Sequence, residues 1–299
     1  MTTLAPLTLE DQERLHNLLG SYPFQTYEYS FLSLYLWKEY ARVRIGVLDD
    51  ALIIRKTEDH KGTYFMQPIG YTAQNLPGII DTLLELRQGD ADFRYLFRDI
   101  EEPFLRELQA SYGPRVSAEE DVKFFDYIYE TEKLIHLVGD KLGKRKNQVH
   151  QFIRDYDYEV KDIHTPEVKE DCLRFSQEWL ASQKNPGREL ICEAAGIRDV
   201  FARIEALHVV GMAVYVRDQI AGFTFGEKIN RQMAIIHVEK GDTAYRGIYA
   251  FLNKTFAERY LYDVPWVNRE EDLGVARLRK AKQAYEPLRL EKKYRVNIR

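Results

Sequence analysis

The sequence predicts a mixed α+β protein in which two similar domains follow each other, each a mixed, mostly antiparallel sheet flanked by helices. Three observations favour this fold. The chain has 299 residues, which suits two domains. Short apolar segments alternate with polar turns and are followed by helical segments, and this order recurs in both halves. We expect the first domain to cover residues 1–130 and the second, which carries the candidate site, residues 131–299.

The second half begins with three short apolar segments separated by polar turns, which predict an antiparallel meander. A helical segment, a short strand, a second helix and a last strand follow. The expected elements are strands at 209–216, 220–225 and 233–238, a helix at 248–259, a strand at 264–267, a helix at 274–285 and a strand at 288–296.

The first half repeats this order. Val209 lies 166 positions after Val43, and Leu288 lies 166 positions after Val122. A nearly constant offset between equivalent elements indicates an internal duplication. The expected elements are strands at 43–48, 51–55 and 63–67, a helix at 76–88, a strand at 93–98, a helix at 101–112 and a strand at 122–129.

Composition and charge exclude several classes of protein. Apolar residues make up 45% of the chain and charged residues 30%, which is typical of a globular protein and excludes intrinsic disorder and collagen. The formal net charge is −4, so no overall excess of basic residues indicates nucleic-acid binding. A site for a polyanion must therefore come from local clusters of Lys and Arg.

Cysteine usage and hydropathy favour a cytoplasmic protein. Cys172 and Cys192 lack the spacing of a zinc site or a disulfide framework, which favours two reduced thiols. The first residues show no secretory leader, and no apolar run approaches the ~18 residues of a membrane span. We expect no transmembrane segment and no metal.

Basic residues gather where a helix is expected to begin. Val149 and Phe152 lie on one face of that helix. The helix dipole does not favour cations at a helix start, so an anion such as phosphate is a candidate partner. A solvated basic face is the alternative. The segment contains Lys141, Lys144, Arg145, Lys146 and Asn147.

A polar turn follows the strand expected at 264–267. Acidic residues before a helix are partly explained as partners of the helix dipole or as caps. That explanation leaves Asn268 and Arg269 unexplained, so the sequence favours a polar site at this strand end. The turn runs Asn268, Arg269, Glu270, Glu271, Asp272.

The helix expected at 274–285 carries cations on several faces. Since successive helical residues are ~100° apart, they cannot all lie on one solvent-exposed face. A buried cation needs an acid or a bound anion. They therefore pair either with the acids of the preceding turn or with a polyanion. The cations are Arg277, Arg279, Lys280 and Lys282.

The strand expected at 233–238 ends in charged residues. Glu239 and Lys240 could serve as a base and as a partner of a carbonyl or phosphate group. An ordinary surface ion pair is the alternative, and a lone His237 in a strand is more often structural. The segment after this strand departs from the glycine spacing of a CoA pyrophosphate loop at Arg246 and Gly247.

These motifs together resemble the phosphatidylglycerol lysyltransferase C-terminal domain family from about Phe125 to Val296. The order of elements is also similar to the GNAT acyltransferase fold. The resemblance implies two tandem GNAT-like domains and transfer of an aminoacyl group from aminoacyl-tRNA, which the lipid-modifying members deliver to phosphatidylglycerol. It is carried by 126–130, 142–147, 237–240, 246–249, 267–274, 278–282 and 285–287.

The implied chemistry assigns roles to residues of this chain. The aminoacyl ester is already activated, so no cofactor is expected; the partners are aminoacyl-tRNA and a small-molecule, lipid or peptide acceptor, with peripheral membrane contact for a lipid. An acetyl-CoA-dependent N-acyltransferase and a non-catalytic RNA- or anion-binding module are the alternatives. The expected catalytic residues are Glu239 or Glu270 as the base or acceptor orienter, with Arg269 and Lys280. The expected substrate-binding residues are Lys144, Arg145, Lys146, Asn147, Lys240, Asn268, Arg279, Lys282 and Tyr285, the last as a stacking partner for the terminal adenine.

Overall fold

The computed structural model describes residues 4–20, 22–139 and 141–299. The chain forms two compact units: unit 1 comprises residues 1–124 together with 292–299, and unit 2 comprises residues 125–291. Each unit is built on one mixed sheet, which has seven strands among the described residues. The predicted α+β class with two helix-flanked sheets is confirmed.

Unit 1 pairs its strands in the order β1-β2-β3-β4-β5-β14-β6. Strands β2 to β4 form an antiparallel meander, and β5 joins β4 in parallel. The strands are β1 (Ala5–Pro6), β2 (Arg44–Leu48), β3 (Ala51–Glu58), β4 (Gly62–Phe65), β5 (Phe97–Ile100), β6 (Val116–Glu120) and β14 (Tyr294–Ile298). The longer helices are α1 (Gln12–Leu19), α2 (Phe31–Leu36), α3 (Leu76–Arg87) and α4 (Glu102–Tyr112).

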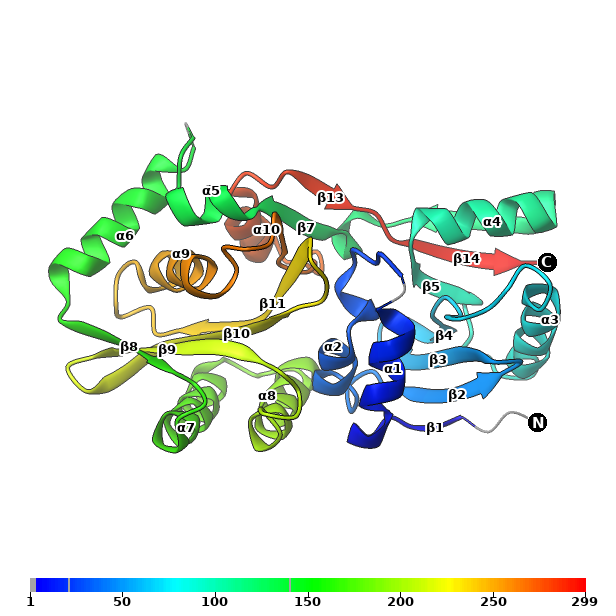
Figure 1. Ribbon diagram of the computed structural model, residues 1–299, viewed down its shortest axis with the longest axis horizontal. Helices are drawn as coiled ribbons and strands as arrows, with labels where there is room; N and C mark the ends of the chain where they lie inside the picture. The colour runs from blue at the N-terminus through cyan, green and yellow to red at the C-terminus, as the bar shows by residue number, and fades with distance from the viewer. Residues whose placement is uncertain (1–3, 21, 140) are drawn as a thin grey trace. The chain divides into compact units, whose positions relative to one another are not determined.

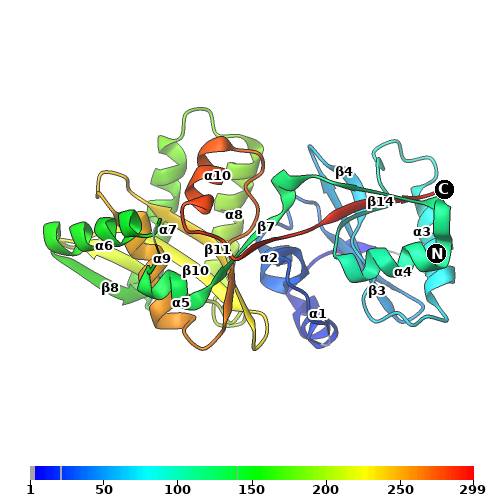
Figure 2. The same ribbon diagram turned by 90° about the horizontal axis from the view of Figure 1, so that it is seen from above.

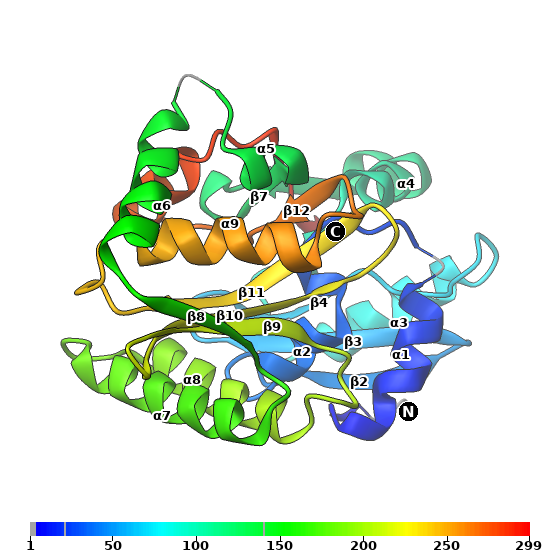
Figure 3. The same ribbon diagram turned by 60° about the vertical axis from the view of Figure 1, so that its left-hand side comes forward.

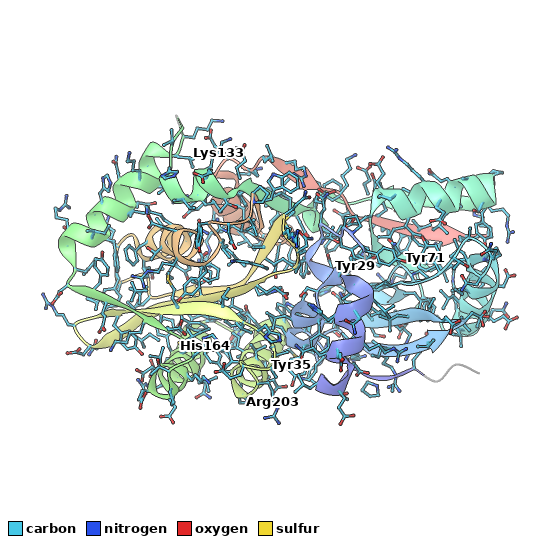
Figure 4. The ribbon with its side chains drawn as sticks, viewed as in Figure 1. Tyr29, Tyr35, Tyr71, Lys133, His164 and Arg203 are labelled. Atoms are coloured by element: carbon cyan, nitrogen blue, oxygen red, sulfur yellow. The ribbon has the colours of Figure 1, made fainter. Side chains whose placement is uncertain are left out.

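Helices α3 and α4 close the hydrophobic core of unit 1. Phe97 of β5 and Phe104 of α4 are buried there, and their rings meet edge to face with centroids 5.5 Å apart. Tyr71, labelled in Figure 4, donates a 2.6 Å hydrogen bond to Glu107 and so ties the segment before α3 to α4. The core of this unit is therefore mainly aromatic and aliphatic.

Unit 2 repeats this plan in the order β13-β7-β12-β11-β10-β9-β8. Strands β9 to β11 form the meander, and β12 joins β11 in parallel. The strands are β7 (Asp126–Glu130), β8 (Tyr158–Asp162), β9 (Val210–Val216), β10 (Gln219–Lys228), β11 (Met233–Gly241), β12 (Trp266–Asn268) and β13 (Arg289–Glu291). The helices are α5 (Thr131–His136), α6 (Gly143–Asp155), α7 (Pro166–Ser182), α8 (Arg188–Ala202), α9 (Ile248–Tyr260) and α10 (Ala276–Gln283).

Helices cover both faces of the sheet of unit 2 (Figures 1 and 3). On one face α9 packs against β10 and β11, and α6 packs on α9, where Phe152 and Phe251 stack with centroids 4.6 Å apart. On the other face, Phe175 of α7 and Phe201 of α8 both meet Phe223 of β10. Among the described residues, no helix is long and apolar enough to cross a membrane.

One strand of each sheet comes from the other half of the chain. Strand β7 ends the first repeat but pairs with β12 and β13 in unit 2. Strand β14 ends the second repeat but pairs with β5 and β6 in unit 1, where it is drawn in red in Figure 2. The observed division therefore differs from the expected one at 130/131. The single strand expected at 288–296 is two strands in different sheets, because a hydrophobic pattern marks a strand but not its partner.

Strand β11 continues beyond its parallel partner. Only three residue pairs join β11 to β12 in the described chain, whereas β11 extends to Gly241. The part of β11 past this ladder carries His237 and Glu239, and the turn after β12 carries Arg269 and Glu270. The polar motifs of the sequence thus meet where these two strands stop pairing.

Candidate active site

Glu239, near the end of β11, is the centre of a polar cluster in unit 2. Both of its carboxylate oxygens lie 3.4 Å from Nη2 of Arg269, and one accepts a 3.2 Å hydrogen bond from the side-chain amide of Asn253 on α9. The side chains of Glu239 and Arg269 each keep 13% of their exposure, whereas Asn253 is fully buried. The cluster therefore joins a carboxylate, a guanidinium and an amide, and the two charged side chains are mostly but not fully buried.

Two tyrosine rings line the guanidinium of Arg269. Its Cζ atom lies 4.7 Å from the ring centroid of Tyr285 and 5.5 Å from that of Tyr129. Arg145 of α6 lies 5.1 Å from the same Tyr285 ring. Burial raises the pKa of Tyr285 to about 12, so this ring stays neutral near pH 7. Cation–π attraction from neutral rings holds Arg269 in place.

Buried contacts fix the turn after β12. The side-chain amide of Asn268 donates to Asp126 at 2.8 Å, and its oxygen accepts from the main-chain amide of Glu270 at 2.7 Å. Glu270 has a φ of 59°, which is uncommon for a residue other than glycine. Nζ of Lys282 donates to the main-chain oxygens of Arg269 and Glu270, the latter at 3.1 Å. Burial lowers the pKa of Lys282 to about 8.

His237 lies between two carboxylates. Its Nδ1 is 2.9 Å from Glu270, and its Nε2 is 2.9 Å from Glu227 of β10. Because a carboxylate accepts but does not donate hydrogen bonds, both ring nitrogens carry protons. Burial alone would lower the pKa of His237, but its hydrogen bonds to the two carboxylates raise that pKa to about 9. His237 is thus a structural imidazolium that anchors Glu270.

Arg279 is tied to the same turn. Its Nε and Nη2 atoms donate to the two oxygens of Asp272 at 2.7 and 3.0 Å, and the Tyr127 hydroxyl donates to the same carboxylate at 2.7 Å. Burial opposes ionisation, yet these hydrogen bonds lower the pKa of Asp272. Arg279 therefore pairs with an acid of the turn, and Lys282 binds main-chain oxygens. Both side chains thus have partners within unit 2, and their binding of phosphate stays a prediction.

Lys240 points to the other face of the sheet. Its Nζ donates to Glu193 of α8 at 2.7 Å and lies 3.7 Å from the ring centroid of Trp179 of α7. Successive residues of a strand point to opposite faces, so Lys240 does not join Glu239. The two neighbours thus lie on different faces of the sheet, and substrate binding by Lys240 stays a prediction.

Other expected site residues are not part of the Glu239 cluster, and most of them lie on the surface. Lys280, expected to be catalytic, is exposed and joins none of the hydrogen bonds or ion pairs of the Glu239 cluster within the described chain. Tyr285, expected to stack on a base, is buried instead. The other exposed residues of the expected set lie on α6 and are Lys144, Lys146 and Asn147.

Several main-chain amides between β11 and α9 are bonded within unit 2. The Arg246 amide donates to the Tyr156 hydroxyl at 3.0 Å. Other amides of this loop bind acceptors within unit 2: those of Asp242, Ala244, Tyr245 and Ile248. A CoA pyrophosphate is bound through free amides at such a helix start, and the five amides named here are already bonded.

Metal-binding side chains are not concentrated in unit 2. Cys172 is buried and Cys192 is partly buried, and both are free thiols. Within unit 2 alone, no three His, Cys, Asp or Glu side chains of the described residues converge closely enough to hold a metal ion. The polar cluster around Glu239 is thus a better candidate for an active site in this unit than the cysteines or a metal centre.

A family comparison covers almost the whole chain. The family described as phosphatidylglycerol lysyltransferase, C-terminal, matches residues 20–297. The chain belongs to this family. A curated relative, an uncharacterized protein of Mycoplasmoides gallisepticum, is 28% identical over 174 residues, which cover 58% of this chain. The chain spans only 56% of the length of that relative.

The comparison with solved structures supports a tandem GNAT-like fold for this member of the lysyltransferase C-terminal family. A conserved protein of unknown function from Bacteroides thetaiotaomicron is 29% identical, covers 100% of both chains and has a TM-score of 0.88. L-PGS from Bacillus licheniformis is 16% identical, over 96% of this chain and 92% of that one, with a TM-score of 0.63. A tandem GNAT protein from the clavulanic acid biosynthesis pathway is 12% identical, over 99% and 97%, with a TM-score of 0.52.

Sequence reasoning missed one residue of the Glu239 cluster, Asn253, and two residues that contact Arg269 and His237, namely Tyr129 and Glu227. Asn253 lies on the apolar face of the helix expected at 248–259. A polar residue on a face expected to be buried is the sequence feature that indicates its involvement in a site. Tyr129 and Glu227 lie in strands, and their contacts with Arg269 and His237 depend on strand pairing that local sequence does not reveal.

Proposed function

We propose that this member of the lysyltransferase C-terminal family transfers an aminoacyl group from aminoacyl-tRNA to a hydroxyl or amine acceptor. The observation that carries the proposal is the cluster of Glu239, Arg269 and Asn253 beside the point where β11 and β12 stop pairing. Family membership supports the same chemistry. The family description makes the lysyl group and phosphatidylglycerol the first donor and acceptor to test.

The reaction exchanges one acyl bond for another. The acceptor oxygen or nitrogen forms a bond to the carbonyl carbon, and the bond from that carbon to the terminal ribose oxygen of the tRNA breaks. The acceptor proton passes to a carboxylate, and the ribose oxygen leaves as a hydroxyl group after taking up a proton. Since the donor ester is already activated, the protein has to position the reactants and stabilise the charge on the carbonyl oxygen.

Arg269 and Glu270 are assigned the two chemical roles. Arg269 stabilises the developing oxyanion, because its guanidinium is already held by Glu239 and two tyrosine rings before substrate binds. Glu270 takes the acceptor proton. Burial raises its pKa, which makes the carboxylate a stronger base, and His237 fixes one of its oxygens.

The tRNA contacts in this proposal come from the exposed cations of α6 and α10. Lys144 and Lys146 lie on α6, and Lys280 lies on α10. Arg145 connects α6 to the Tyr285 ring, which also contacts Arg269. Surface cations of this kind bind phosphates with an affinity that falls as salt rises.

A CoA donor has less support. The segment after β11 departs at Arg246 and Gly247 from the glycine spacing of a CoA pyrophosphate loop, and five of its amides are already bonded within unit 2. We propose that the donor is aminoacyl-tRNA instead. Since aminoacyl-tRNA is made in the cytoplasm, the protein acts there in this proposal, on an acceptor in solution or at a membrane surface.

Transfer of a labelled amino acid tests this function. Charged tRNA is offered with phosphatidylglycerol vesicles, peptides or small amines, and acetyl-CoA is offered in parallel. We expect a labelled product with one acceptor class, loss of that product in Arg269→Ala, and retention in Arg259→Ala, which replaces an exposed arginine of α9. Transfer from acetyl-CoA alone would refute the proposal.

A further inference from the structure

Two buried polar atoms of the Glu239 cluster have no hydrogen-bond partner within the described residues. They are Oδ1 of Asn253 and Nη1 of Arg269. Asn253 has no exposed surface, and both residues contact the same carboxylate. Buried polar groups in native proteins are nearly always paired, so two orphans around one carboxylate indicate a place prepared for a ligand.

The contact with Glu239 determines which kind of hydrogen-bond partner each of the two unpaired atoms requires. A carboxylate accepts hydrogen bonds, so the group of Asn253 that faces it at 3.2 Å is the NH₂ and not the carbonyl oxygen. Oδ1 is therefore a free acceptor that requires a donor. Nη1 of Arg269 is a free donor that requires an acceptor.

The Glu239 carboxylate itself has capacity left. Its contacts with Arg269 are 3.4 Å long and the one with Asn253 is 3.2 Å, which exceeds the 2.7–2.9 Å of a strong charge-assisted hydrogen bond. A cationic donor between Glu239 and Asn253 would add a short hydrogen bond to each. The complementary ligand is therefore positive at one end and offers an acceptor oxygen at the other.

We propose that this cluster binds the free α-ammonium group and the adjacent carbonyl oxygen of an aminoacyl donor. The ammonium donates to Oδ1 of Asn253 and to Glu239, while the carbonyl oxygen accepts from Nη1 of Arg269. An aminoacyl ester carries these two groups on neighbouring carbon atoms. The inference rests on the proposed function and adds which part of the donor the cluster recognises.

Such a site selects a class of donor rather than one amino acid. An acetyl group or an N-acetylated aminoacyl group has the carbonyl oxygen but no ammonium, so Asn253 would stay unpaired and Glu239 would lose its cation. A site built to hydrogen-bond a polar group rejects analogues that lack it. The amino-acid side chain is not contacted by these three residues in the proposal, so they do not set which amino acid is used.

Stable donor mimics test the inference without turnover. Short acceptor-stem RNAs ending in a 3′-aminoacylamido-adenosine are prepared with either a free or an acetylated α-amine, and their dissociation constants are measured by titration. We expect the wild-type chain to bind the free amine at least about tenfold more tightly. Asn253→Leu, which keeps the volume but loses the oxygen, lowers this ratio toward one, and so does Glu239→Gln.

Thr255→Val is the matched control, because Thr255 is a buried polar residue of α9 outside the cluster. It leaves the ratio unchanged. Equal binding of both mimics by the wild-type chain, or an unchanged ratio in a folded Asn253→Leu variant, overturns the inference alone, and a water molecule then fills the place. Failure to bind either mimic, together with no transfer from charged tRNA, overturns the proposed function and the inference with it. The wild-type ratio decides the matter even where a variant fails to fold.

Discussion

Replacing His237 by Gln removes the buried imidazolium between Glu227 and Glu270. In the wild-type chain, the folded-state pKa of about 9 lies above the ordinary value of 6.5, so protonated His237 stabilises the folded state. This contribution is complete below pH 6.5 and is lost as the pH rises through 9. Gln can bond to the same carboxylates but carries no charge, so the variant lacks this pH dependence.

The magnitude follows from the two pKa values of His237. The difference between 6.5 and about 9 corresponds to about 3 kcal/mol of unfolding free energy. The ring has no exposed surface, so solvent does not screen its hydrogen bonds. We expect the wild-type chain to lose about 3 kcal/mol between pH 6 and pH 9 relative to His237→Gln.

The assay has to follow unit 2 alone. Trp179 and Trp266 belong to unit 2 and Trp37 belongs to unit 1, so a Trp37→Phe background makes tryptophan fluorescence report unit 2. Urea unfolding at pH 6 and pH 9 then gives the free energies. The control is His136→Gln, since His136 on α5 is an exposed histidine that also lies 2.9 Å from a carboxylate.

One outcome would refute the reasoning about His237. If the difference between wild type and His237→Gln is the same at pH 6 and pH 9, the ring is not a clamped imidazolium. Nitrogen-15 chemical shifts give an independent reading, because both ring nitrogens should be protonated at pH 7.5. A neutral tautomer at that pH would mean that one of the carboxyl groups carries the proton instead.

The remaining predictions concern the cluster and its surroundings. Arg269→Lys keeps the charge but loses the guanidinium fork, so steady-state transfer assays should show kcat reduced roughly 10–100-fold with little change in KM for tRNA. Lys280→Ala should lower the salt dependence of RNA binding by about one phosphate contact in fluorescence titrations. Lys282→Ala should leave that slope unchanged but cost about 1–3 kcal/mol in urea unfolding, because it strips a donor from buried main-chain oxygens. Gly247→Ala should cost about 2 kcal/mol or more in the same assay, since its φ is 94° and a Cβ would overlap the main-chain oxygen of Gln148.

The two meanders and the helices that follow them were predictable, because short-range patterns of apolar and polar residues indicate such elements. Alternating apolar segments and polar turns predicted both meanders and the helices that follow them, and the offset of 166 positions indicated their duplication. The exchange of β7 and β14 was not predictable in the same way. Both strands have the expected apolar character, but which sheet they join depends on contacts with strands far away in the sequence.

The cluster was predictable in part for the same reason. The turn at Asn268 and Arg269 stood out because caps and dipole partners did not explain its composition, and both residues are in the cluster or support it. The cations of α10 were harder to interpret. Lys280 and Lys282 are two positions apart on a helix, and only the fold shows that the first faces solvent and the second binds main-chain oxygens.

The two repeats differ in the length of the strand that carries Glu239 in unit 2. In unit 1, β4 has four residues and ends at Phe65, the residue that pairs with β5. In unit 2, β11 has nine residues and runs well past its ladder with β12. The additional length carries His237 and Glu239, and β4 has no corresponding segment. Unit 1 has buried charged residues of its own, but several of them lie on β3, on β5 and in the β3–β4 turn, where Nζ of Lys61 is 3.3 Å from Glu58 and 3.7 Å from Asp99. The two units therefore place buried charges on different strands, and among the described residues only unit 2 places them on the strand before the helix that follows the meander.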